Sequence, residues 1–139
     1  MRTFLALLLS GTLATGANAE TIWHFIAGNS PDLEGTRISF FYDPTTLTAP
    51  SEDTRRVVIL GEFIAGAQSA MTFGESEVSD ITFDCQISRV RPERTDWYEF
   101  AQARGAITKT FGRSDWRPLY SDVMRTVRSV ICSLPVNVS

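Results

Sequence analysis

The chain has 139 residues, a formal net charge of −3 at pH 7 and 43% hydrophobic residues. This composition is that of a folded globular domain and excludes a disordered or low-complexity chain. The mild acidity also argues against a dedicated nucleic-acid-binding protein, which would carry a basic surface.

The first 19 residues have the pattern of a secretory signal peptide. Arg2 supplies a positive start, Phe4–Leu9 an apolar core, and Ala17-Asn18-Ala19 a small-residue cleavage site. The apolar run is shorter than the roughly 18 residues of a membrane-spanning helix, and no cysteine stands near the cleavage site to carry lipid. We therefore predict a cleaved signal peptide at residues 1–19, one domain at residues 20–139, and a periplasmic or extracellular location without a transmembrane segment.

Cys85 and Cys132 are the two cysteines of the sequence. An even cysteine count in an exported domain predicts that they form a disulfide, with two buried free thiols as the alternative. The bridge would close a long loop, which the chain-entropy model values at about 4 kcal/mol of stability.

The central element predicted is a strand at Ile81–Ser88, where apolar and polar side chains alternate as they do on a strand with one buried and one wet face. Other strands are predicted at Thr21–Ile26, Thr36–Tyr42, Arg56–Ile64, Asp96–Gln102 and Ile107–Phe111. Turns or loops are predicted at Asp43-Pro44, at the acidic Gly74–Ser79 and at Arg89–Arg94, which contains Pro92. Because most connections are short, we expect antiparallel neighbours.

A helix should follow Ser121, whose hydroxyl can cap a free amide of the first turn. Apolar residues then recur at helical spacing as far as Leu134. Cys132 falls on the polar side of this pattern, so the helix is predicted to end near Ile131. The fold class expected is α+β: an antiparallel sheet of about five to six strands, with the C-terminal helix packed on one face and one disulfide.

The sequence carries no motif for catalysis. His24 is the one histidine, no Gly-x-Ser-x-Gly motif or phosphate-binding glycine loop occurs, and disulfide-bonded cysteines cannot act as nucleophiles or metal ligands. Asp43, Asp84 and Glu99 leave a glycosidase-like acid pair as the enzymatic alternative, although each also fits a turn or an exposed strand face. We predict no enzyme, no catalytic residue, no cofactor and no metal.

The strongest candidate for a ligand-binding surface is the trio Arg89, Arg91 and Arg94. Guanidinium groups pair well with carboxylates and sulfates, but a solvated turn would have the same composition. Tryptophans anchor many interfaces, and the chain offers three that could instead be core residues: Trp23, Trp97 and Trp116.

Several short motifs follow one another along the chain: Trp23, Phe41-Tyr42-Asp43-Pro44, Phe83-Asp84-Cys85, Trp116-Arg117-Pro118 and Val130-Ile131-Cys132. In this order the sequence resembles the surface-adhesin protein E family of bacterial exported proteins. The resemblance implies an antiparallel sheet tied by one disulfide to a C-terminal helix, in adhesins that bind host matrix proteins and can form homodimers. The chain departs from the family in lacking a lipid-attachment cysteine and in lacking a tryptophan in the strand Val57–Phe63.

We therefore predict an exported, non-catalytic binding protein with a protein or cell-envelope ligand. The alternative is a periplasmic inhibitor or envelope-maintenance protein that binds an enzyme.

Overall fold

The computed structural model describes residues 20–28, 37–64, 73–119 and 121–136, so the predicted signal peptide lies outside the described residues. Six strands form one antiparallel sheet in chain order: β1 (His24–Gly28), β2 (Arg37–Thr48), β3 (Thr54–Ile64), β4 (Ser76–Asp84), β5 (Arg89–Phe100) and β6 (Arg104–Phe111). The two-residue β7 (Arg117–Pro118) also pairs with β5, and α1 (Asp122–Ser133) closes the chain. These elements confirm the predicted antiparallel sheet with one C-terminal helix and one disulfide.

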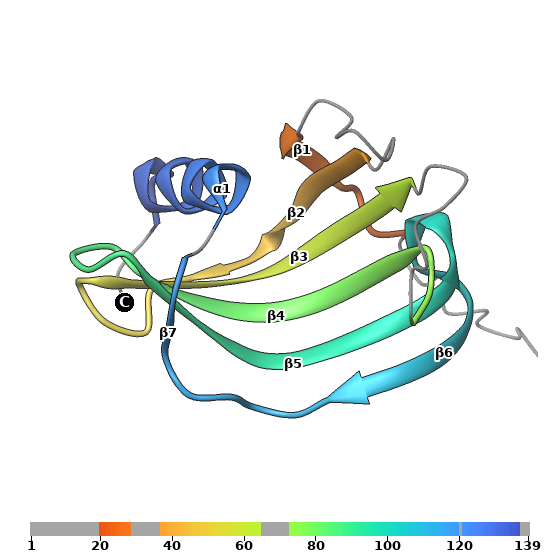
Figure 1. Ribbon diagram of the computed structural model, residues 1–139. Coiled ribbons are helices and arrows are strands. Elements are labelled where there is room, and N and C mark those ends of the chain that lie inside the picture. The colour runs from red at the N-terminus through yellow and green to blue at the C-terminus, as the bar shows by residue number, and fades with distance from the viewer. Residues whose placement is uncertain (1–19, 29–36, 65–72, 120, 137–139) are drawn as a thin grey trace, which may run out of the picture.

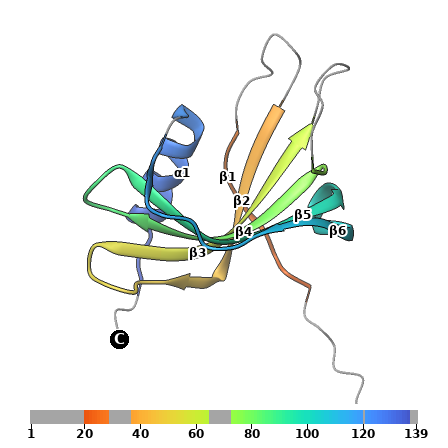
Figure 2. The same cartoon turned by 60° about the horizontal axis from the view of Figure 1, so that its bottom comes forward.

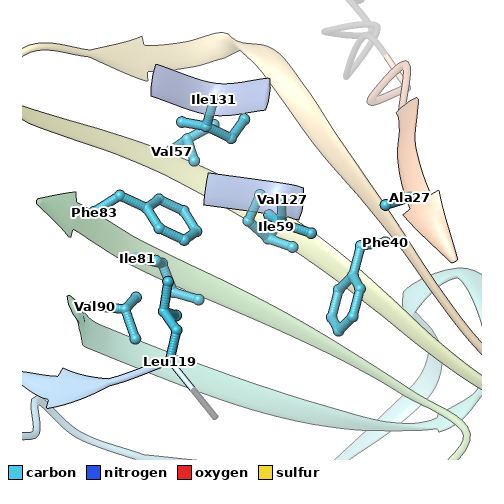
Figure 3. Packing of buried hydrophobic residues seen from close by; sticks show 10 residues of the cluster. All are labelled: Ala27, Phe40, Val57, Ile59, Ile81, Phe83, Val90, Leu119, Val127 and Ile131. Carbon is cyan, nitrogen blue, oxygen red and sulfur yellow. The ribbon is translucent and has the colours of Figure 1, made fainter. Parts of the chain in front are cut away.

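The sheet is bent, and α1 lies on the side toward which it curves (Figures 1 and 2). The core fills the space between them: Val57 and Phe83 from the sheet meet Val127 and Ile131 from the helix, and all four are fully buried (Figure 3). Val127 and Ile131 are four residues apart, which places them on one helical face. Burial of this face against the sheet is what stabilises so short a helix.

The helix begins as predicted but ends later. The Ser121 hydroxyl accepts a hydrogen bond from the Met124 amide at 3.2 Å, which confirms the cap. Cys132 stays inside the helix instead of leaving it, because the flank it shares with Arg128 faces the turn after β4. From that flank Arg128 Nε donates to the Asp84 carbonyl at 2.7 Å, and Cys132 forms the predicted disulfide with Cys85, their Cα atoms 5.7 Å apart.

The predicted strand Ile81–Ser88 is correct only in its first half. β4 ends at Asp84, and residues 85–88 form a turn in which Ile87 is 56% exposed. The Asp84 carboxylate accepts hydrogen bonds from the amides of Gln86 and Ile87 at 2.9 and 3.0 Å, a local bond pattern that bends the chain. The prediction that the polar side chains of this strand face solvent is also wrong, since Thr82 and Asp84 are only 3% and 6% exposed.

Three segments predicted as turns or loops belong to strands. β2 continues through Asp43-Pro44 to Thr48 with a register shift, β4 begins at Ser76, and Arg89–Arg94 is the first half of β5. Pro92 is accommodated because its partner on β4 lies at a register shift between Asp80 and Ile81, and irregular pairing is where a sheet tolerates proline.

Candidate functional site

The predicted binding arginines lie on a strand and are already paired with acids. Arg89 Nε contacts Asp84 at 2.9 Å, Arg91 Nε contacts Glu93 at 2.9 Å, and Arg94 Nε contacts Asp96 at 3.2 Å. Their charges are therefore largely compensated within the fold.

Trp116 covers two of these arginines. The guanidinium carbons of Arg89 and Arg91 lie 4.6 and 4.8 Å from its ring centroid, within range of a cation–π attraction. The structure thus brings two of the three arginines together around a half-buried tryptophan, in an arrangement that stabilises the fold. Arg94 remains the most open of the three, with a side chain 62% exposed.

Glu93 is the hub of this network. Burial opposes its ionisation, but hydrogen bonds from Arg113 (2.6 Å), Thr82 (2.9 Å) and Arg91 (2.9 Å) together outweigh that cost and lower its pKa to about 2. A carboxylate with three donors has little capacity left for a ligand, so this face offers few free acceptors.

A different site lies beside the helix, and its floor is a row of cross-strand neighbours. Phe40 pairs with Gly61, Gly61 with Glu77, and Glu77 with Trp97. Directly opposed residues project to the same side of a sheet, and Phe40 belongs to the core at its margin beyond Ile59 (Figure 3). Glu77 and Trp97 therefore face the same side as the helix.

Gly61 makes room for the acid. A Cβ at this position would lie 3.2 Å from Glu77 Cγ and 3.2 Å from the rings of Phe40 and Phe63. A side chain at position 61 would therefore crowd Glu77 and both rings. The bare glycine lets the Glu77 stem lie close to the β3 backbone.

The site beside the helix is a groove, and aromatic rings form one of its walls. Phe63 contacts Trp97, Trp97 contacts Phe73, and Phe73 contacts Phe111, with ring centroids 5.2, 5.7 and 5.4 Å apart. Phe73 and Phe111 are exposed large apolar side chains. A continuous wall of four rings that opens to solvent at one end is a surface that a ligand could cover.

The groove comprises two adjoining hollows of about 550 and 270 Å³. The larger extends toward Phe111 and Gly112, and the smaller reaches Met124 of the helix. Both are lined by Glu77 and Arg117. The larger hollow falls within the volume range of small-molecule and side-chain pockets.

Glu77 is the unusual group in the groove. It is half-buried, and none of the described residues donates a hydrogen bond or forms an ion pair with its carboxylate. Burial raises its pKa to about 7, against a smaller opposing attraction from Arg117. A half-buried carboxyl with no ion-pair partner among the described residues, set in an open groove, is a candidate functional group. A donor or a cation that reaches it would favour its charged form.

The opposite face carries a larger hollow of about 720 Å³. Trp23 and the segment before β1 line it, together with Leu60 and Asp43. The Asp43 carboxylate already accepts hydrogen bonds from the Thr45 amide and hydroxyl at 2.9 and 2.6 Å. Glu20 and Glu62 also line this hollow, and its Trp23 is half-buried.

The remaining candidates for chemistry do not converge. Asp84 is the last residue of β4, where the effect of burial is outweighed by its hydrogen bonds, which lower its pKa, while Glu99 is exposed near the end of β5. His24 is exposed and packs edge-on against Tyr42 at 5.5 Å. Within the described residues, no cluster of three or more metal-ligating side chains occurs.

Sequence reasoning missed Glu77 because Gly74–Ser79 carries no apolar alternation. One signal could have located it: the long strand at Arg56–Ile64 needs a hydrogen-bonding neighbour over its whole length. That requirement extends the next strand back to Ser76 and puts Glu77 opposite Gly61.

No protein-family model matches the sequence, and neither a curated protein nor a solved structure is significantly similar to it. The resemblance to surface-adhesin protein E thus stays a prediction from the sequence.

Proposed function

We propose that this chain is an exported, non-catalytic binding protein and that the groove beside α1 is its ligand site. The observation that carries the proposal is the unpaired Glu77 at the foot of a wall of aromatic rings. Large rings supply contact area at low entropic cost, and a single buried polar group supplies specificity.

Binding without catalysis is favoured by the groove lining. Among the described residues its one carboxylate is Glu77, so the lining does not pair two acids as a glycosidase requires. The Cys85–Cys132 bridge further supports passage to an oxidising compartment. No helix in the described part of the chain is long and apolar enough to cross a membrane.

The family resemblance suggests what kind of ligand to test. A protein E-like adhesin would bind a host matrix protein, whereas the alternative, a periplasmic inhibitor or envelope-maintenance protein, would bind an enzyme of the envelope. Both roles would use the same groove. Separate capture from matrix proteins and from envelope extract, with the exported protein immobilised, distinguishes them.

Blocking the groove tests the proposal. Gly112 lines the larger hollow, and a Cβ built there meets no atom within 4 Å, so Gly112→Trp can obstruct the groove without disturbing the fold. Ser129→Trp, on an exposed position of α1, is the matched control. We expect Gly112→Trp to lose capture of the ligand and Ser129→Trp to retain it; equal capture by both variants would refute the groove as the site.

A further inference from the structure

We infer that the groove receives a lysine or arginine side chain of a protein partner, whose cationic group pairs with the Glu77 carboxylate. This inference rests on the proposed function and adds the chemistry of the ligand. It starts from charge complementarity: Glu77 is the acid of the groove lining, and no described residue forms an ion pair with it.

The surroundings of Glu77 suit a cation on an apolar stem. Trp97 lies directly opposite Glu77 on β5 and stacks at a tilt on Phe63. Aromatic faces attract ammonium and guanidinium groups, and their apolar bodies cover the methylene stem of a long basic side chain. Phe73 and Phe111 continue the aromatic wall toward solvent. A basic side chain whose backbone stays outside the groove could therefore lie along this wall and reach the Glu77 carboxylate.

An anionic or purely apolar ligand fits less well. An apolar occupant would leave the Glu77 carboxyl without a hydrogen bond in a drier site, which is costly. An anion would have to approach the Glu77 carboxylate itself, although Arg117 would attract it. The other basic groups are engaged: Arg113 is held by Glu93 at 2.6 Å, and Lys109 lies over the Phe111 ring at 5.5 Å.

Arg117 is the competing cation. It lines both hollows and attracts the Glu77 carboxylate, yet the two form no ion pair. If the groove takes a basic side chain, Arg117 repels it, and Arg117→Gln should tighten binding. If the groove takes an acidic ligand, Arg117 attracts it, and the same substitution should weaken binding.

Binding of a cation should also expel a proton. Among the described residues, the charged side chains that line the groove with Glu77 are Arg117 of β7 and Arg113, which is paired with Glu93. Lys109 of β6 lies beyond Trp97 in the same cross-strand row. The neighbours on β2, β3 and α1 carry no charge: Phe40, Gly61 and Met124. Because the Glu77 pKa is about 7, affinity for a cation should rise roughly 30-fold from pH 5.5 to pH 8.

The probes are short extended peptides that differ at one central residue: lysine, arginine, norleucine or glutamate. Their binding to the exported protein is followed by the NMR signal of the Trp97 indole, at pH 5.5 and pH 8. We expect the lysine and arginine peptides to bind at least tenfold more tightly than the norleucine peptide at pH 8, and Glu77→Gln to abolish both the preference and the pH dependence. Arg117→Gln should strengthen binding of the lysine peptide.

Equal binding of norleucine and lysine peptides, tighter binding of the glutamate peptide, or no response of Trp97 to millimolar peptide would each overturn the inference. Its failure is separable from that of the proposed function. If Gly112→Trp abolishes capture of the partner while Glu77→Gln does not, the groove binds a ligand but not through a cation.

Discussion

Replacing Glu77 with glutamine should stabilise the protein at neutral pH, and the gain should vanish in acid. Burial raises the pKa of the Glu77 carboxyl from its ordinary value of 4.5 to about 7 in the folded protein. As the pH rises, the Glu77 carboxyl therefore ionises earlier in the unfolded chain than in the folded protein. The stability of the folded wild type is unaffected by this group below pH 4.5 and decreases as the pH rises from 4.5 through 7. At roughly 1.4 kcal/mol per pH unit the loss is at most about 3 kcal/mol, an upper limit because the side chain is half-buried and partly screened.

Urea unfolding of the wild type and Glu77→Gln between pH 4 and pH 8.5 measures this difference. The two proteins should be similar near pH 4, and the variant should become progressively more stable above pH 5. Glu99→Gln removes an exposed carboxylate from β5 and should show no such trend. A Glu77→Gln variant that is less stable than the wild type at pH 8 would mean that the carboxylate has a structural partner and is not an unpaired acid.

Three further results are expected. Cys132→Ser should cost about 2–5 kcal/mol in urea unfolding, and free alkylation of Cys85 and Cys132 in the native protein would contradict the bridge. The triple change of Arg89, Arg91 and Arg94 to alanine should cost roughly 1–3 kcal/mol, because the Asp84 and Glu93 side chains are 9% and 8% exposed and would lose donors; unchanged stability would restore these arginines as a free ligand surface. Intact mass of the exported protein should correspond to a chain that starts at Glu20, and a species that retains Met1 would contradict the predicted cleavage.

The features that follow from local physics were predictable from the sequence. The Ser121 cap, the amphipathic helix and the pairing of the two cysteines each depend on a few neighbouring residues or on a count. The antiparallel order of the strands also followed from short connections. Such signals do not depend on knowing which surface the rest of the chain covers.

The errors arose where tertiary partners override local appearance. Arg89–Arg94 reads as an exposed turn because it is charged and contains Pro92, yet acids on β4 and β5 neutralise it and a register shift admits the proline. Helical periodicity puts Cys132 on the polar flank of α1, which predicts that it leaves the helix. That flank instead faces the end of β4 and the turn after it, where Cys132 bonds Cys85 and Arg128 donates to the Asp84 carbonyl. Glu77 looked like a loop acid because its importance comes from Gly61 and Trp97, its partners on neighbouring strands.

The location of the ligand is the most direct test of this account. NMR mapping of the protein with its captured partner should show the largest shifts at Phe63, Glu77, Trp97 and Phe111, with little change around Trp116 or Trp23. Shifts concentrated on the Arg89 and Trp116 face, or on the hollow beside Trp23, would contradict the assignment of the groove as the binding site.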